Sequence, residues 1–155
     1  MPGAKTHDLI SITVLAIILS GLFYLMVFKQ NSPAVGYLDI YSILIFALAY
    51  LFATFFLSPD LDIDSTPYKR WGILRILWWP YKVIFKHRGM SHHPIIGPLS
   101  ILINLIIILL PLVILSELGV AQIPLKFIAA AIIGIVIPIE VHIVADAVIS
   151  KAKHH

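Results

Sequence analysis

Four long runs of apolar residues alternate with shorter polar segments along the chain, at residues 9–28, 35–57, 95–115 and 122–149. A helix rises 1.5 Å per residue, so about 20 residues cross about 30 Å of hydrocarbon. Each run is long enough, and within lipid a helix satisfies its own backbone polar groups. The pattern therefore predicts an all-α integral membrane protein with four transmembrane helices, built as a single membrane domain over residues 1–155.

The first run has an alternative interpretation as a secretory signal peptide, because Lys5 stands ahead of it. However, the apolar run is longer than the hydrophobic core of a signal peptide usually is. The sequence Lys29-Gln30-Asn31 also offers no small-residue cleavage site. We therefore expect a retained membrane anchor.

Residues 58–94 form the long segment between the second and third runs. Ser58-Pro59-Asp60 predicts a helix start, with serine as the N-cap and proline in the first turn. Cationic and aromatic residues follow, and the apolar residues that recur there at helical spacing are Trp71, Leu74 and Trp78. Pro80 should end or kink this helix. The segment thus predicts an interfacial helical segment in the headgroup layer.

Composition supports the membrane assignment. Of 155 residues, 60% are hydrophobic and only 12% are charged, and the mean hydropathy is +0.99. These values exclude an ordinary soluble domain. Cysteine is absent, so thiolate metal ligands are excluded as well.

The distribution of Lys and Arg predicts the orientation in the cell membrane. In a four-span topology, only Lys29 and Lys126 lie on one side. The cationic residues on the other side are Lys5, Lys69, Arg70, Arg75, Lys82, Lys86, Arg88, Lys151 and Lys153. This bias predicts that both termini and segment 58–94 are cytoplasmic. The net charge of +3 suits anionic membrane lipids as partners, and no nucleic acid is expected.

Most His and Asp side chains stand at the cytoplasmic ends of the apolar runs. In the fourth run, His142 and Asp146 are four residues apart and share one helix face, and Glu140 lies nearby. Ionisable groups within a span are costly and are candidates for function. The pair could bind a metal, or it could be a buried hydrogen-bonded pair without one.

The central segment adds further candidate ligands. Asp60, Asp62 and Asp64 alternate and offer hard oxygen ligands, although such groups also serve as helix caps or solvated acids. His87 and His92 flank a glycine that could let both rings converge. The terminal residues His154 and His155 are expected to be frayed or added by cloning.

Taken together, these groups predict a metal centre at one membrane surface. With His7, which precedes the first run, four His and three Asp exceed the needs of one tetrahedral ion and suit two ions. A mixed nitrogen and oxygen ligand set favours zinc, with manganese and iron as alternatives.

Several motifs carry a resemblance to a known family. They are His7, Pro59-Asp60-Leu61-Asp62, His87-Arg88-Gly89-Met90-Ser91-His92 and His142-x-x-x-Asp146. Together they resemble the YdjM-like family of membrane-bound metal-dependent hydrolases. The phrases at residues 2–8 and 59–79 look closer to a branch of that family described as metal-binding membrane proteins. The resemblance implies a multi-pass helical protein whose metal ligands are His7, Asp60, Asp62, His87, His92, His142 and Asp146. It leaves open whether His93 and Asp64 are ligands or bystanders.

The leading functional hypothesis is a metal-dependent hydrolase of phosphoester substrates at the cytoplasmic membrane surface, acting on lipid-linked substrates in particular. Asp60 or Asp64 would accept a proton from water, and Arg88 would pair with the phosphate. The alternative is a non-catalytic metal-binding membrane protein in which ions hold the helices together. Metal transport ranks below both, because the centres of the first three runs are almost wholly apolar.

Overall fold

The computed structural model describes residues 3–28, 38–85, 90–115 and 123–152, and this part of the chain is helical without any strand. The α-helices are α1 (Ala4–Phe28), α2 (Ile40–Phe56), α3 (Thr66–Arg70), α4 (Trp79–Ile84), α5 (Ile96–Leu115) and α6 (Leu125–Ala152). Two 3₁₀ helices, η2 (Pro59–Asp62) and η3 (Gly72–Trp78), connect them. The predicted all-α class is confirmed.

Three helices are long and apolar enough to cross a membrane, namely Ala4–Phe28, Ile96–Ile114 and Leu125–Ala152. The second predicted span is a shorter helix of 17 residues, which is about 25 Å long. Residues 35–37 of that predicted run lie outside the described residues. The structure therefore supports a membrane protein with three candidate spans, while the fourth span remains a prediction.

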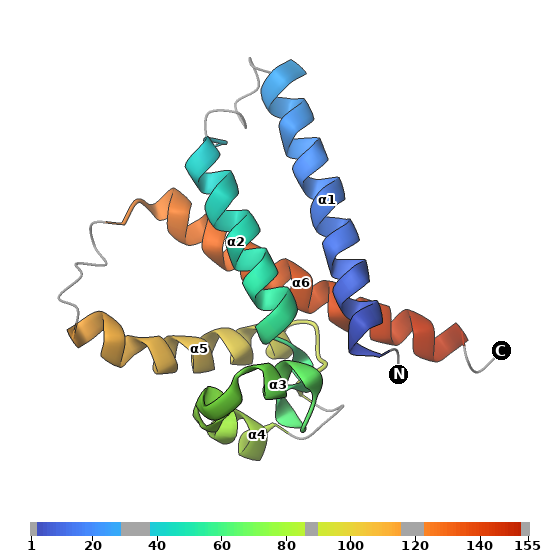
Figure 1. The fold of residues 1–155 in the computed structure, drawn as a ribbon, viewed down its shortest axis with the longest axis vertical. Coiled ribbons are helices and arrows are strands. Elements are labelled where there is room, and N and C mark those ends of the chain that lie inside the picture. Colours follow the sequence, from blue (N-terminus) through green and yellow to red (C-terminus); the bar gives the residue numbers. More distant parts are fainter. Residues whose placement is uncertain (1–2, 29–37, 86–89, 116–122, 153–155) are drawn as a thin grey trace.

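The central pair of helices is α2 and α6, which cross in Figure 1. At Gly134 of α6, an added Cβ atom would lie only 2.6 Å from the carbonyl oxygen of Phe46 and 3.0 Å from Cβ of Ala49. The absence of a side chain at Gly134 thus lets the two backbones approach closely, as small residues do in membrane helix pairs. Helix α1 joins this pair through the Tyr50 hydroxyl, which donates to the Ser11 carbonyl at 3.0 Å.

The short elements between α2 and α5 are fastened to the end of α2. Arg70 donates to the carbonyl oxygen of Phe55 at 3.0 Å, and the Trp71 indole donates to that of Phe56 at 2.9 Å. The last carbonyls of a helix lack partners within the helix, so these bonds complete its C-terminus. Arg70 also donates hydrogen bonds to both carboxylate oxygens of Asp8 in α1. These bonds hold the segment between α2 and α5 at the C-terminal end of α2 and the N-terminal end of α1.

The structure corrects two details of the predicted interfacial helix. Trp78 is fully buried and packs against Trp71, with ring centroids 5.3 Å apart, whereas Leu74 is exposed. The predicted face does not form, because Trp71, η3 and the start of α4 are not parts of one continuous α-helix. Pro80 does not end a helix but stands in the first turn of α4, where its missing N–H costs nothing. Location of the segment in the headgroup layer remains a prediction.

Candidate metal centre

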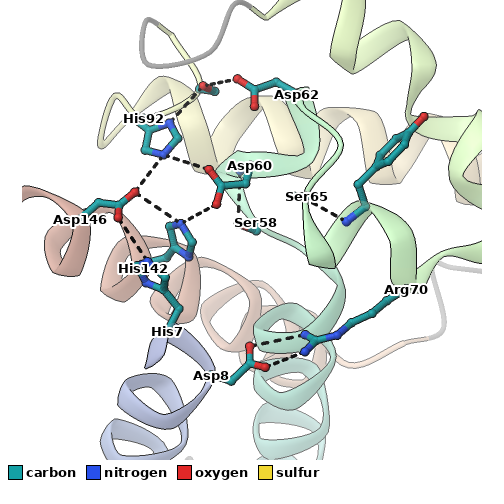
Figure 2. A network of polar contacts seen from close by, with 12 residues as sticks. His7, Asp8, Ser58, Asp60, Asp62, Ser65, Arg70, His92, His142 and Asp146 are labelled. Carbon is teal, nitrogen blue, oxygen red and sulfur yellow. Dashed lines mark hydrogen bonds and ion pairs between the residues drawn. The ribbon is translucent and has the colours of Figure 1, made fainter. Parts of the chain in front are cut away.

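Four side chains from three separate segments converge beside the crossing of α2 and α6. They are Asp60 in η2, His92 just before α5, and His142 and Asp146 in α6. One ligand atom from each lies within 4.8 Å of the others. Figure 2 shows the four side chains pointing toward a common centre. The predicted helical pair at positions 142 and 146 is thus joined by an acid and an imidazole that are distant in the sequence.

The distances within this cluster match those around a small divalent ion. His92 Nε2 lies 3.4 Å from Asp60 Oδ1 and 3.3 Å from Asp146 Oδ2. His142 Nε2 lies 3.4 Å from Asp60 Oδ2 and 3.7 Å from Asp146 Oδ2. Tetrahedral ligands at about 2.0–2.1 Å from zinc are separated from one another by about 3.3–3.4 Å. Each imidazole therefore lies near the separation of two zinc ligands from each carboxylate, and one ligand atom of every group lies within 4.8 Å of the others.

The ligand-type atoms of the cluster do not satisfy one another's hydrogen-bonding capacity. Asp60 Oδ1 and His142 Nε2 are buried without a hydrogen-bond partner among the described residues. Charge-assisted N–H···O bonds are usually about 2.7–2.9 Å long, shorter than the contacts in the cluster. Burying such polar atoms unpaired is costly, and a cation would remove that cost. The residues therefore fit a metal ion.

His7 of α1 lies on the opposite side of Asp146. Its Nε2 is 3.2 Å from Asp146 Oδ1, while Asp146 Oδ2 faces His92 and His142. The His7 ring also stacks on that of His142, with centroids 3.9 Å apart. The Asp146 carboxylate thus presents one oxygen to each side, as a group shared between two ions would. The number of ions remains a prediction.

Asp62, predicted as a ligand, lies outside the group of four. Its Oδ2 accepts a hydrogen bond of 2.8 Å from the Ser91 hydroxyl, whose oxygen lies 3.2 Å from Nδ1 of His92. With the Ser91 proton directed to Asp62, the Ser91 oxygen can accept from the Nδ1–H of His92, which leaves Nε2 as the ligand atom. Asp62 and Ser91 therefore orient a ligand, as partners behind metal-bound histidines do.

The charges in the cluster shift the pKa values of Asp60 and His92 in opposite directions. Burial alone would raise the pKa of Asp60, but attraction from the neighbouring imidazoles of His142 and His92 outweighs it and holds that pKa below its usual range. For His92, burial disfavours the cation, yet attraction to the nearby carboxylate of Asp60 prevails and raises the pKa. Asp60 is therefore ionised near neutral pH, as a metal ligand must be.

Two further candidate residues, Asp64 and His93, make contacts away from the cluster. Asp64 is 74% exposed in its side chain and pairs with Lys82 at 2.7 Å. His93 accepts the backbone N–H groups of Ile95 and Ile96 at the start of α5, which is a capping role. His87 and Arg88 lie outside the described residues.

Sequence reasoning missed the role of Ser91. The available signal was its place beside His92 in a His- and Gly-containing motif, but serine next to histidine is too common to indicate a role by itself. Its complete burial and its bond to Asp62 reveal the role only in the folded chain.

A partly buried His/Asp cluster that could hold a metal ion defines the class, a candidate metal-binding protein with helices long enough to cross a membrane. The chain belongs to the family described as "Uncharacterized metal-binding protein (DUF2227)", whose profile matches residues 2–155.

A protein of Aquifex aeolicus (strain VF5), named only as an uncharacterized protein, is 51% identical to this chain over 55 residues. That match covers 35% of this chain and 39% of the Aquifex protein, so it spans less than half of the relative. No solved structure is matched. Family membership establishes metal binding as the family property, whereas kinship with YdjM-like hydrolases remains a prediction.

Proposed function

We propose that the protein is a metal-dependent hydrolase of phosphoester substrates, lipid-linked ones in particular, acting at the cytoplasmic membrane surface. The observation that carries this proposal is a cavity of about 140 Å³ beside the cluster, lined by both Asp60 and His142. Structural zinc sites are closed by protein ligands, whereas catalytic sites keep one position open to water or substrate. A cluster bordered by a cavity favours catalysis.

Each side chain of the cluster has a proposed task. Asp60, His92, His142 and Asp146 would hold the first ion, and His7 with Asp146 would contribute to a second. A divalent ion in such a site, with zinc the first choice and manganese or iron as alternatives, supplies Lewis-acid catalysis and activates water at neutral pH. Asp60 would also accept a proton from the activated water. Asp64 is paired with Lys82 at the surface, and the proposed phosphate contact of Arg88 rests on the sequence.

A second candidate function is a non-catalytic metal staple. The observation in its favour is that the four candidate ligands come from η2, the segment before α5, and α6, which lie far apart in the sequence. An ion held by all three would fasten the central segment and α5 to the bundle. This candidate predicts that removing the metal lowers the stability of the protein, and that the protein hydrolyses no substrate.

The first experiment is the metal content of detergent-purified protein by mass spectrometry. Wild type should hold about two ions per chain, and both His142→Ala and Asp146→Ala should lose metal. His93→Ala is the matched control, because this imidazole caps α5 and should not affect the metal. Full metal retention in His142→Ala and Asp146→Ala would refute the site.

The second experiment separates an enzyme from a staple. Metal-loaded wild type is assayed with phospholipids, lipid phosphates and a chromogenic phosphodiester, with the His142→Ala variant as background. Hydrolysis by wild type alone supports the proposed activity. Metal-replete protein that is inert on every substrate, but unfolds when the metal is chelated, would favour the staple.

A further inference from the structure

The cavity beside the metal cluster is enclosed by α1, α2, α3 and α6 and is rich in hydroxyl groups. The hydroxyl side chains that line it are Ser11, Thr54, Ser58, Ser65 and Thr66. Its volume of about 140 Å³ exceeds that of one water, which occupies about 30 Å³ in the liquid. The cavity thus has room for a small organic group.

Several of these polar groups need a hydrogen-bond partner. Thr54 Oγ1 is buried without a partner in the part of the chain that the structure describes, and so is Nδ1 of His7, a side chain that is only 6% exposed. Ser58 and Ser65 accept backbone N–H groups through their oxygens, and each keeps its own proton to donate. Unpaired buried groups are costly, so a ligand bearing both donors and acceptors would be stabilised here.

The charge of the lining indicates what kind of ligand fits. Among the described residues, no Lys or Arg lines the cavity. The acid Asp8 does line it, but its carboxylate is held by Arg70 at 2.6 Å. An anion would therefore be drawn to the metal cluster rather than to the cavity, whereas an uncharged group with several hydroxyls matches the hydroxyl lining.

We propose that this cavity binds the polyol part of a phosphoester, a glycerol or sugar group, while the phosphoryl group lies at the adjacent His/Asp cluster. The inference rests on the proposed function, since it names the substrate class for that centre. Thr54 and Nδ1 of His7 are the groups whose hydrogen bonds the polyol would complete.

The test is a binding measurement that does not depend on turnover. Calorimetry on metal-loaded protein in detergent compares glycerol 3-phosphate with methyl phosphate, which carries the same phosphoryl group without a polyol. Wild type should prefer glycerol 3-phosphate by about tenfold, the value of one good hydrogen bond. Thr54→Val, which keeps the shape but removes the hydroxyl, should abolish most of that preference and leave the affinity for methyl phosphate unchanged.

Thr13→Val is the matched control, because it makes the same substitution on an exposed face of α1. The comparison is repeated with vesicles containing phosphatidylglycerol or phosphatidylmethanol, so that a preference seen only there assigns the polyol to a lipid headgroup. The proposal is overturned if the polyol ligand and its methyl counterpart bind equally well both as soluble phosphates and as vesicle lipids. It is also overturned if Thr13→Val loses the preference as much as Thr54→Val does. A clear preference without hydrolysis of any substrate would refute the enzyme while leaving the binding site intact.

Discussion

The imidazole rings of His7 and His142 stack with centroids 3.9 Å apart and planes inclined by 19°. This contact joins the first and last helices at the metal centre, so the position of α1 depends on the same imidazole that contacts Asp60 and Asp146. The candidate metal site and the packing of α1 on α6 therefore share this residue pair.

The first prediction separates the two roles of His7. His7→Phe keeps a ring to stack on His142 but has no nitrogen, whereas His7→Ala removes both. Both variants should lose one of two bound ions, and in the presence of a chelator only His7→Ala should lower the free energy of unfolding, by about 1 kcal/mol. Metal analysis and chemical denaturation in detergent measure these effects. Full metal content in His7→Phe would show that His7 is not a ligand.

The second prediction concerns the hydrogen bonds from Asp62 through Ser91 to His92. Ser91→Ala should weaken metal binding by about 10–100-fold without unfolding the protein, because His92 loses the group that fixes its orientation. Asp62→Asn keeps an oxygen that can accept from Ser91, so its metal affinity should stay close to that of wild type. Competition with a chelator measures both affinities. A loss in Asp62→Asn as large as that in Asp60→Asn would make Asp62 a direct ligand.

The third prediction uses a residue that touches no ligand. A methyl group at Gly97 would collide with the backbone carbonyl of Ser91, which is too rigid to yield cheaply. Gly97→Ala should therefore displace the segment that carries His92 and reduce metal affinity. Gly21→Ala is the control, since nothing lies within 4 Å of a methyl group there. Identical metal affinities in the two variants would contradict the close packing at Gly97.

The fourth prediction assigns a structural task to Arg70, a cation that could otherwise serve the phosphate. Its guanidinium holds both oxygens of Asp8 and the carbonyl of Phe55. Arg70→Lys cannot reproduce this fork and should lower the free energy of unfolding by about 1–3 kcal/mol. Arg75→Lys, in the same segment and exposed, should change little. A weaker affinity for phosphoesters at unchanged stability would instead place Arg70 at the substrate.

The fifth prediction is an opposite pH dependence with and without metal. The raised pKa of His92 stabilises the metal-free protein fully below its ordinary value of 6.5, and this contribution is lost as the pH rises through the raised value. The lowered pKa of Asp60 stabilises above 3.8, and that contribution is lost only in stronger acid. Metal binding requires neutral imidazole, so the metal-bound form should gain stability as the pH rises.

Unfolding temperatures at about pH 6 and about pH 8, measured with chelator and with added zinc, test this crossing. The chelated protein should be more stable at the lower pH, and the zinc-loaded protein at the higher one. Parallel shifts in both samples would contradict the assigned charge states.

Much of the fold could be predicted from the sequence, because hydropathy and helical periodicity are local properties. The apolar runs located α1, α5 and α6 to within a few residues, and the spacing of His142 and Asp146 placed them on one helix face. The length of α2 was overestimated, because the run at 35–57 is apolar beyond the helix that forms within it. Hydropathy measures solubility in lipid, and it does not show where a helix begins.

Tertiary structure decided which of the ligand-type residues meet. Asp60 and Asp62 are two residues apart and of the same type, yet only Asp60 faces the cluster, because a 3₁₀ turn directs neighbouring positions to different sides. The sequence by itself determined the types of ligand and the ends of the helices where they stand. Only the packing of η2, the segment before α5, and α6 decided that Asp60, His92, His142 and Asp146 share one centre, because their distances depend on contacts between segments far apart in the chain.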